Sequence, residues 1–252
     1  GVDQRREYHH KDVFRHTLKV VDNICENTDN VWLRMAALLH DIAKPRTKDF
    51  KEGIGWTFHG HEEVGARMIK PIFRRMRLPL TEVPYVEKLV RLHLRPMALV
   101  DSEVTDSAVR RLMFDAGAEV DDLMTLCHAD ITSKNPRLVE RVRRNYDLVL
   151  EKMKEVEEKD QIRAWQPPLR GDEIMQLCGL SAGPLIGVLK DAVIDAILDG
   201  KIPNDHNSAV AHLLSIKDAF MDQARRSGSV VKVHRSDLFK GKRLPGARDE
   251  SS

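Results

Sequence analysis

The stretch DVFRHTLKVVDNIC, residues 12–25, shows the pattern that most of this chain repeats. Its apolar residues recur at helical spacing, which places them on one face of an α-helix. Asp12 precedes the first of them, where a carboxylate can accept hydrogen bonds from the free amides of a first helical turn. The stretch therefore predicts an amphipathic helix whose apolar face carries Val13, Leu18, Val21 and Cys25.

The same periodicity continues along the chain, and no stretch shows the alternation of a β-strand. Helix boundary signals agree with it: Thr81 and Pro84 precede one apolar run, Thr105 with Asp106 precedes AVRRLMF, and Gly117 follows that run. The sequence predicts an all-α fold, in which further apolar faces are formed by Val64, Met68, Ile72 and Met76 and by Val86, Leu89, Val90 and Leu92.

Cysteine usage and hydropathy exclude two classes of protein. The 3 cysteines of the 252 residues contain no CxxC pair, so neither a disulfide framework nor a thiolate zinc site is indicated. No apolar run approaches the roughly 20 residues of a membrane helix, and the opening GVDQRREYHH lacks the features of a signal peptide. We expect a cytoplasmic protein without a membrane partner. Its start at Gly1 leaves open that it is a fragment of a longer protein.

Basic residues gather in the middle of the chain, although the formal net charge is only +2. Such clustering favours a phosphate-bearing partner, and a solvated helical surface is the alternative interpretation. If the partner is RNA, the candidate contacts are Arg74, Arg75, Arg91, Arg95, Arg110 and Arg111.

Composition and glycine content predict four segments. Residues 1–135 form a first domain, and the charged residues 136–164 read as a long connecting helix. Proline and glycine then become frequent, so residues 165–225 form a second, smaller helical unit with Asp172 as its first N-cap. Residues 226–252 are basic and lack periodicity, which indicates a disordered tail.

Potential metal ligands stand out on the predicted helices. His16 lies on the inward face of the first helix, His40 and Asp41 are adjacent in AALLHDIAK, and Asp130 follows an apolar helical run. Each could be a core residue with an ordinary partner. Together they are two imidazoles and two carboxylates, a donor set that suits a borderline divalent ion, and a buried carboxylate needs such a partner. Three further histidines lie in the sequence between the adjacent pair His40 and Asp41 and the later Asp130: His59, His61 and His93.

Five motifs carry a family resemblance: YHHKDVFRHTLKVVDN (8–23), AALLHDIAKP (36–45), TFHGHEEVGARM (57–68), KLVRLHLRP (88–96) and DLMTLCHADITSKN (122–135). They resemble the HD-type phosphohydrolase region of bacterial tRNA nucleotidyltransferases and poly(A) polymerases. The segment PLRGDEIMQLCGLSAGPLIGVLKDAVIDAILDG (168–200) resembles the RNA-contacting helical part of the same enzymes. The resemblance implies a divalent metal (Ni, Co, Mn, Mg or Fe) bound by His16, His40, Asp41 and Asp130, with His61 and His93 as ligands of a second ion.

The implied chemistry is hydrolysis of phosphomonoesters, 2′,3′-cyclic phosphates or nucleotides, with His40, Asp41 and Lys44 as catalytic residues. Lys44 could neutralise phosphoryl charge, or it could be an ordinary lysine at a helix C-terminus. Glu62 and Glu63 could orient His61, or they could be solvated residues of a first helical turn. The remaining histidines are expected to lie outside the site: His9, His10, His128, His206, His212 and His234.

Two departures from the family pattern bear on function. The resembled enzymes carry an N-terminal nucleotidyltransferase head, and nothing of that kind precedes Tyr8, so we expect no nucleotide addition by this chain alone. Ala43 stands where the family usually has glycine, a small change. Gly183, Pro184 and Gly187 suggest RNA contact by resemblance, or only a tight turn and a close helix crossing.

Three hypotheses follow. The chain is a metal-dependent hydrolase acting on phosphate esters, including RNA ends; or it is an RNA-binding body and tail, with tRNA as partner and a vestigial or structural metal site; or it is a helical scaffold without metal. The complete ligand set favours the first.

Overall fold

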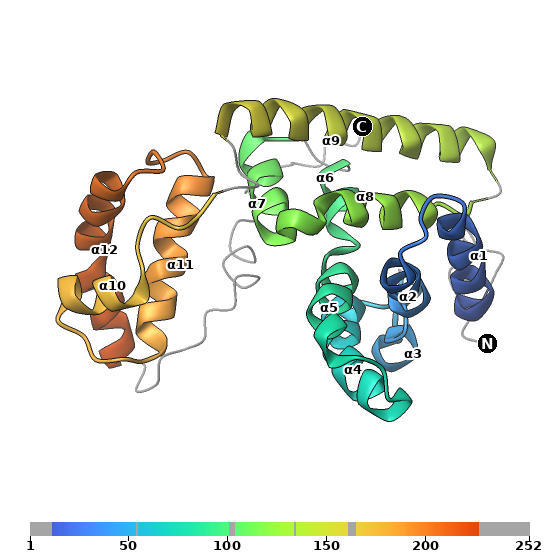
Figure 1. Ribbon diagram of the computed structural model, residues 1–252, viewed down its shortest axis with the longest axis horizontal. Helices are drawn as coiled ribbons and strands as arrows, with labels where there is room; N and C mark the ends of the chain where they lie inside the picture. The colour runs from blue at the N-terminus through green and yellow to red at the C-terminus, as the bar shows by residue number, and fades with distance from the viewer. Residues whose placement is uncertain (1–11, 54, 101–103, 134, 161–164, 227–252) are drawn as a thin grey trace, which may run out of the picture. The chain divides into compact units, whose positions relative to one another are not determined.

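The computed structural model describes residues 12–53, 55–100, 104–133, 135–160 and 165–226, and it confirms the all-α fold (Figure 1). In chain order the elements are α1 Val13–Cys25, α2 Val31–Leu39, α3 Lys44–Thr47, β1 Asp49–Lys51, β2 Gly55–Thr57, α4 His61–Met76, η1 Leu80–Glu82, α5 Val83–Leu92, α6 Arg95–Val100, α7 Asp106–Ala116, η2 Gly117–Glu119, α8 Val120–Ala129, α9 Pro136–Asp160, α10 Gly171–Cys178, α11 Pro184–Leu198 and α12 His206–Arg226.

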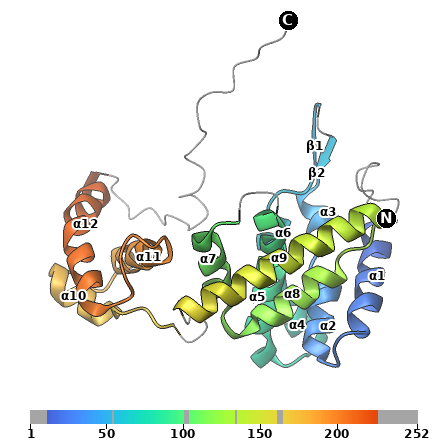
Figure 2. The ribbon, with the colours of Figure 1, turned by 90° about the horizontal axis from the view of Figure 1, so that it is seen from above.

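The chain divides into two compact units, residues 1–165 and residues 166–252. In the first unit α4 packs along α5, α2 contacts both α1 and α5, and α8 lies against all three of α1, α2 and α5 (Figure 2). Fully buried apolar side chains fill the space between these helices, among them Ile24, Leu33, Ile69, Phe73, Leu89, Leu112 and Leu123. Burial of this apolar surface is the main stabilising contribution to the bundle.

Three predicted helix boundaries of the first unit are confirmed, and one is wrong: Thr81 lies inside η1, and Glu82 is the N-cap of α5. The Asp12 carboxylate accepts a hydrogen bond of 2.8 Å from the Arg15 amide, and the Thr105 hydroxyl accepts one of 3.3 Å from the Ala108 amide. Gly117 ends α7 with a φ of 60°, in the left-handed region that glycine adopts without strain. Asp12 and Thr105 each bind a free amide of a first helical turn, and Gly117 ends its helix.

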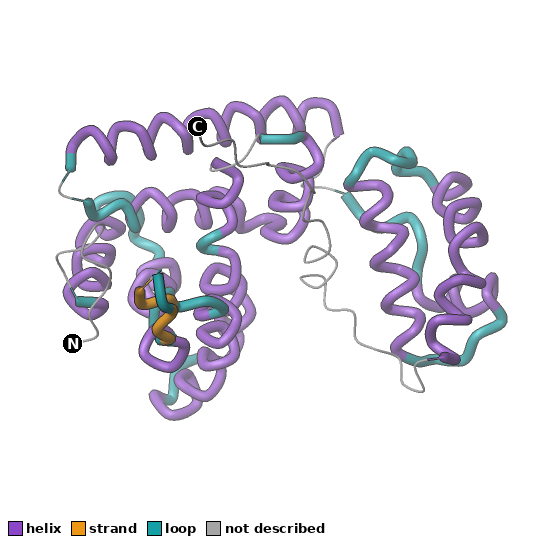
Figure 3. The backbone as a smooth tube through the Cα atoms, turned by 180° about the vertical axis from the view of Figure 1, so that it is seen from behind, coloured by secondary structure: helices purple, strands orange, loops and turns teal. Residues whose placement is uncertain are grey.

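A small β-hairpin is the feature that periodicity did not predict. β1 and β2 pair antiparallel between α3 and α4, with Phe50 opposite Trp56 (Figure 3, orange). Each strand has only three residues, which is too short for an alternation of polar and apolar side chains to be recognised. Gly53 and Gly55, with φ of 75° and 89°, allow the chain to reverse between the strands.

The long charged helix predicted near residues 136–161 is confirmed as α9, and it does more than connect. Tyr146, Val149, Met153 and Val156 are buried along one face of α9, which packs on α6, α7 and α8. α9 is therefore part of the first compact unit. Where the HD domain ends inside this unit stays a prediction.

The second unit contains α10, α11 and α12, and it corrects the expectations for Asp172 and Gly187. Asp172 is not the N-cap: α10 begins at Gly171 after Arg170, and the Asp172 carboxylate instead pairs with the Arg170 guanidinium at 2.6 Å. His206 does have a partner, because its Nε2 contacts the Glu173 carboxylate. No close helix crossing occurs at Gly187, where an added Cβ would meet nothing within 4 Å.

The predicted tail lies almost wholly outside the described residues, as do His9, His10 and His234. Among the helices that the structure describes, none is long and apolar enough to cross a membrane.

Candidate metal centre

Helix ends bring the predicted ligands of the first unit together. His16 lies inside α1, but His40 follows the last residue of α2, Asp41 comes next, and Asp130 follows α8. His61 begins α4 and His93 follows α5. The packing of α1, α2, α4, α5 and α8 thus directs six side chains from five helices to one place, and all but Asp130 are almost completely buried.

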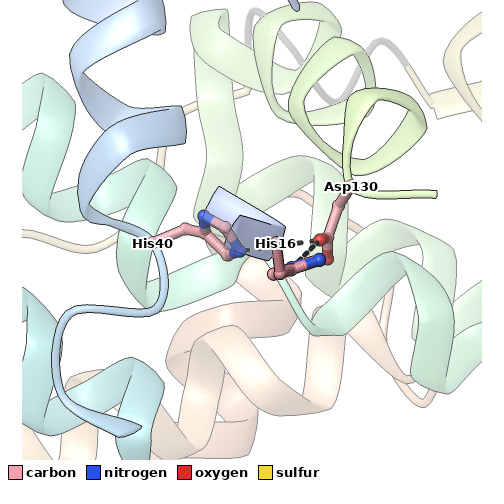
Figure 4. Close-up of side chains that lie close together, drawn as sticks. All are labelled: His16, His40 and Asp130. Atoms are coloured by element: carbon pink, nitrogen blue, oxygen red, sulfur yellow. Dashed lines mark ion pairs between the residues drawn. The ribbon is translucent and has the colours of Figure 1, made fainter. Parts of the chain in front are cut away.

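A first group of ligand atoms is formed by His16, His40 and Asp130, whose donor atoms lie within 4.8 Å of one another (Figure 4). The Oδ1 atom of Asp130 is 2.9 Å from Nε2 of His16 and 3.5 Å from Nε2 of His40. These residues are separated by as many as 114 positions in the sequence, yet they face a common point. Three donors at this spacing can share one cation.

A second group is formed by Asp41, His61 and His93, again within 4.8 Å. The two Nε2 atoms of His61 and His93 are 3.3 Å apart, and Oδ1 of Asp41 is 3.3 Å from Nε2 of His61. The other oxygen of Asp41, Oδ2, lies 3.4 Å from Nε2 of His16 and 3.3 Å from Nε2 of His40. Asp41 therefore links the two groups: its Oδ1 faces His61 in the second group, and its Oδ2 faces His16 and His40 in the first.

Backbone carbonyls orient three of the four imidazoles. A carbonyl oxygen only accepts, so Nδ1 of each ring must carry the proton and Nε2 of the neutral ring keeps its lone pair. All three Nε2 atoms point into the cluster, ready to bind a cation. The hydrogen bonds run from His40 Nδ1 to the Ala37 carbonyl at 2.7 Å, from His61 Nδ1 to Phe58 at 2.8 Å and from His93 Nδ1 to Val90 at 2.7 Å.

Thr132 holds the fourth imidazole, and the sequence analysis missed it. Its Oγ1 lies 2.9 Å from Nδ1 of His16, on the side of the ring away from Asp130. Such a partner fixes the ring and raises its basicity toward a bound metal. The only available signal was the position of Thr132 two residues after Asp130, and a hydroxyl at that spacing is too common to be informative.

Neighbouring imidazoles and Lys44 offset the negative charge of the two buried carboxylates. Burial lowers the pKa of His40, but the carboxylates of Asp41 and Asp130 outweigh it and raise that pKa well above its ordinary value. Burial raises the pKa values of Asp41 and Asp130, yet the charge on His40 and hydrogen bonds from neighbouring imidazoles hold both well below the usual range. Burial and the charge on His40 lower the pKa of His93 to about 4.

The residues present fit a divalent cation. Nε2 of His40 is buried and makes no well-oriented hydrogen bond, although carboxylate oxygens lie near it. The lone pairs of His61 and His93 face each other at 3.3 Å, an arrangement that a cation or a proton between them would stabilise. Imidazole nitrogens with carboxylate oxygens suit Zn, Fe, Ni, Co or Mn.

Comparison with known proteins agrees with this geometry. Residues 13–134 match the HD domain family. The chain contains an HD domain. Over 199 residues, which are 77% of this chain and 44% of the relative, it is 33% identical to the A-adding tRNA nucleotidyltransferase of Deinococcus radiodurans. Over 204 residues, 77% of this chain and 43% of the relative, it is 34% identical to the CC-adding tRNA nucleotidyltransferase of Thermus thermophilus.

A multifunctional CCA protein of Legionella pneumophila is 28% identical over 153 residues, which are 56% of this chain and 35% of that protein. The resemblance to the HD region of tRNA nucleotidyltransferases is thus confirmed. The chain spans less than half the length of the curated relatives it matches, 44% and 43% in the first two.

Lys44 of the HD motif points into the site. Its Nζ is 2.7 Å from Oδ2 of Asp41 and 5.8 Å from the centre of the Phe58 ring. Lys44 is the first residue of α3, whose four residues form a single turn, so the alternative of an ordinary lysine in the last turn of a helix stays open. Ala43 is fully buried with φ of −91°, a conformation that needs no glycine, and its methyl group packs 3.7 Å from the position of a Cβ on Gly65.

The acidic residues after His61 have separate roles. Glu63 pairs with Arg91 at 2.8 Å and with Arg67 at 2.9 Å, so it stabilises the contact between α4 and α5 and does not orient His61. Burial raises the pKa of Glu63, but Arg91 and Arg67 lower it below its ordinary value. Glu62 lies 3.8 Å from Nδ1 of His61, too far for a hydrogen bond.

His59 and His128 do not enter either ligand group. His59 is exposed just before α4. The ring of His128 packs against Tyr146 of α9, with their centroids 5.0 Å apart.

The arginines predicted to contact RNA fall into two groups, exposed ones and ones with partners inside the protein. Arg74 and Arg75 are exposed in the last turn of α4, whereas Arg91, Arg95 and Arg110 form ion pairs inside the first unit. Arg111 is half-buried and also has an interaction within the protein. Most of their partners are carboxylates distant in the sequence: Glu63 for Arg91, Asp115 for Arg95 and Asp160 for Arg110, whereas Glu87 lies four residues before Arg91 on the same helix.

Proposed function

We propose that the HD domain is a divalent-metal-dependent phosphohydrolase acting on phosphomonoesters, 2′,3′-cyclic phosphates or nucleotides. The observation that carries the proposal is the meeting of two ligand groups on either side of Asp41, each with its donor atoms within 4.8 Å. His16, His40, Asp41 and Asp130 would hold one ion, and His61 and His93 a second. Ni, Co, Mn, Mg and Fe are the candidates.

The bound ion supplies Lewis acidity, which withdraws charge from a phosphoryl oxygen and lowers the pKa of water. Asp41 keeps its oxygens deprotonated beside the imidazoles, so it holds both ligand groups together. Lys44 is the lysine whose ammonium group pairs with Asp41, and its side chain is 15% exposed. It can contact a phosphoryl oxygen as negative charge develops there.

Metal analysis followed by a hydrolysis screen tests this proposal. Purified protein should contain or take up a divalent ion and hydrolyse p-nitrophenyl phosphate or 2′,3′-cyclic AMP with added Ni, Co, Mn, Mg or Fe. Asp41→Asn should lose at least a hundredfold in rate while the fold is retained, because it removes the oxygen negative charge shared by both groups. Asp49→Asn, on the exposed β1 strand, is the control and should keep full activity.

We also propose that the chain acts in RNA processing with tRNA as partner, since the relatives that it matches are tRNA nucleotidyltransferases. A nucleotidyltransferase head, covalent or separate, would accompany it. Arg74 and Arg75 at the exposed end of α4 are the first candidates for phosphate contact.

Binding of tRNA as a function of salt tests the RNA role. Replacing Arg74 and Arg75 by serine should weaken binding about equally for all tRNA sequences and reduce the salt dependence by about two counterions. Arg144→Ser, at an exposed residue of α9 in the first unit, provides a surface control. Binding of tRNA without any metal-dependent hydrolysis would favour the alternative, an RNA-binding module whose metal site is structural.

A further inference from the structure

The hairpin between α3 and α4 exposes an aromatic face. Phe50 and Trp56 are cross-strand partners, so their side chains lie on the same side of the hairpin, and they are 60% and 41% exposed. On the opposite side Thr57 is buried and donates a hydrogen bond of 3.2 Å to the Asp49 carbonyl. The hairpin therefore buries the polar side chain of Thr57 and leaves its aromatic pair exposed to solvent, the reverse of ordinary burial.

A lysine completes this face. Nζ of Lys48 lies 4.2 Å from the centre of the Trp56 ring, and the rings of Phe50 and Trp56 meet edge to face with centroids 5.1 Å apart. We call Lys48, Phe50 and Trp56 the hairpin platform. Exposed aromatic rings beside a cation are the combination that binds bases of single-stranded nucleic acid together with their phosphates.

Charge around the hairpin platform suits an anionic partner. In residues 45–52, three cationic side chains outnumber two anionic ones, and Lys44 just before them is paired with Asp41; the five are Arg46, Lys48 and Lys51 against Asp49 and Glu52. A purely structural role, in which the aromatic pair only stabilises the short hairpin, accounts for the pairing. It does not account for the local excess of positive charge.

Both ends of the hairpin lead into the metal centre. Before β1, α3 begins at Lys44, whose Nζ contacts Asp41. After β2, Phe58 accepts the hydrogen bond that orients His61, and the Phe58 ring is 5.8 Å from Nζ of Lys44. Trp56 precedes Phe58 by only two residues, a backbone distance of about 7 Å, so the aromatic face lies close in the chain to the residue that orients His61.

We infer that the hairpin platform stacks an unpaired base of a single-stranded nucleic acid near its end, and so delivers the terminal phosphate group to the metal centre. Delivery to the metal centre rests on the proposed hydrolase function. Stacking of the base does not, and it can be measured without hydrolysis. In this arrangement Trp56 and Phe50 offer their ring faces to the base, and Lys48 neutralises the adjoining phosphate.

Equilibrium binding of a hexamer of oligoadenylate, in chelator so that no hydrolysis occurs, tests the stacking. The variant Phe50→Val with Trp56→Val keeps β-branched residues that favour strand pairing but removes both π-faces. It should bind the hexamer about tenfold to a hundredfold more weakly than the unaltered protein. The exchange variant Phe50→Trp with Trp56→Phe keeps two aromatic faces and should bind within about threefold of the unaltered protein.

Three controls separate stacking from other effects. Phe14→Val removes an aromatic residue that is 65% exposed on α1 and should leave binding unchanged. A hexamer of abasic phosphodiester should bind the unaltered protein, the double-valine variant and the exchange variant equally weakly, because it offers charge without bases. Lys48→Gln should reduce the salt dependence of oligoadenylate binding by about one counterion. Two results would overturn the inference. One is that the double-valine variant binds oligoadenylate as tightly as the unaltered protein does. The other is that the unaltered protein binds the abasic hexamer as tightly as it binds oligoadenylate.

A kinetic measurement then tests delivery to the metal centre. With an oligoadenylate carrying a 3′-phosphate, the double-valine variant should show a KM raised about tenfold with kcat changed little, while glycerol 2-phosphate, which has no base, should be hydrolysed equally by both proteins. If the unaltered protein hydrolysed neither substrate, the hydrolase function would be rejected and the stacking of the base would still stand. A lowered kcat for both substrates in the variant would reject delivery by the hairpin platform.

Discussion

Replacing Thr132 by valine should weaken metal binding while the fold is preserved. Thr132 Oγ1 is the partner of His16 Nδ1, and valine has nearly the same shape without the hydroxyl. In the absence of a cation the His16 ring can leave Nδ1 without a proton. When Nε2 binds a cation, Nδ1 must keep its proton, and that proton then has no acceptor in the variant.

The size of the effect follows from burial. His16 is 3% exposed, so solvent cannot replace the lost acceptor. An unsatisfied buried donor costs about 1 to 3 kcal/mol, which corresponds to a fall in metal affinity of about fivefold to 150-fold. Loss of one such outer partner in metalloproteins typically gives about tenfold to a hundredfold. We therefore expect a decrease of about tenfold to a hundredfold in the association constant.

Isothermal titration of the metal-free protein with Co²⁺ or Ni²⁺ measures this change directly. Thr125→Val is the matched control, because the Thr125 hydroxyl donates only to the Asp121 carbonyl on the same helix and contacts no ligand. That variant should bind metal with the affinity of the unaltered protein. If Thr132→Val bound metal within twofold of the unaltered protein, His16 would not be a ligand held by Thr132.

Other predictions concern protons, packing and metal removal. The carboxylates of Asp41 and Asp130 raise the pKa of His40 well above its ordinary value, so a cation must displace a proton to bind there. Metal affinity should therefore fall by up to about tenfold per pH unit as the pH decreases below that pKa. Metal titrations at several pH values measure this change. In metal-free protein the same raised pKa gives a stability contribution that is present at low pH and is lost as pH rises through it. Gly65→Ala would bring a Cβ within 3.2 Å of Val90 and should lower the unfolding temperature, whereas Gly187→Ala, with open space around it, should raise stability by about 0.5 to 1 kcal/mol. Removal of metal with a chelator should lower the unfolding free energy by about 2.7 kcal/mol relative to protein in cation at a hundred times Kd, as measured by denaturant titration with and without cation.

Local patterns in the sequence were sufficient to predict the helices. Asp12 and Thr105 cap helices as expected because an N-cap depends on residues three positions away, and α9 was predicted almost to its ends. The hairpin was missed because three-residue strands carry too little periodicity. Asp172 was placed wrongly because a carboxylate is favourable both at an N-cap and within a first turn, and only the backbone distinguishes the two.

The meeting of the ligands could not be derived from spacing alone. His16 and Asp130 approach within 2.9 Å because α1 packs against the end of α8, a contact between segments that are distant in the sequence. The family resemblance supplied that pairing before the structure showed it. Thr132 had no such signal, and the ion pairs of Arg91, Arg95 and Arg110 depend on carboxylates brought near by tertiary packing.

Anomalous X-ray diffraction from cobalt-loaded crystals, recorded at the cobalt absorption edge, shows directly whether these side chains bind a divalent cation. We predict an anomalous peak within about 2.0 to 2.2 Å of Nε2 of His16 and His40 and of a carboxylate oxygen of Asp130. A second peak, if present, should lie on the other side of Asp41, toward His61 and His93. Cobalt bound at full stoichiometry with no peak among these side chains would contradict the metal centre.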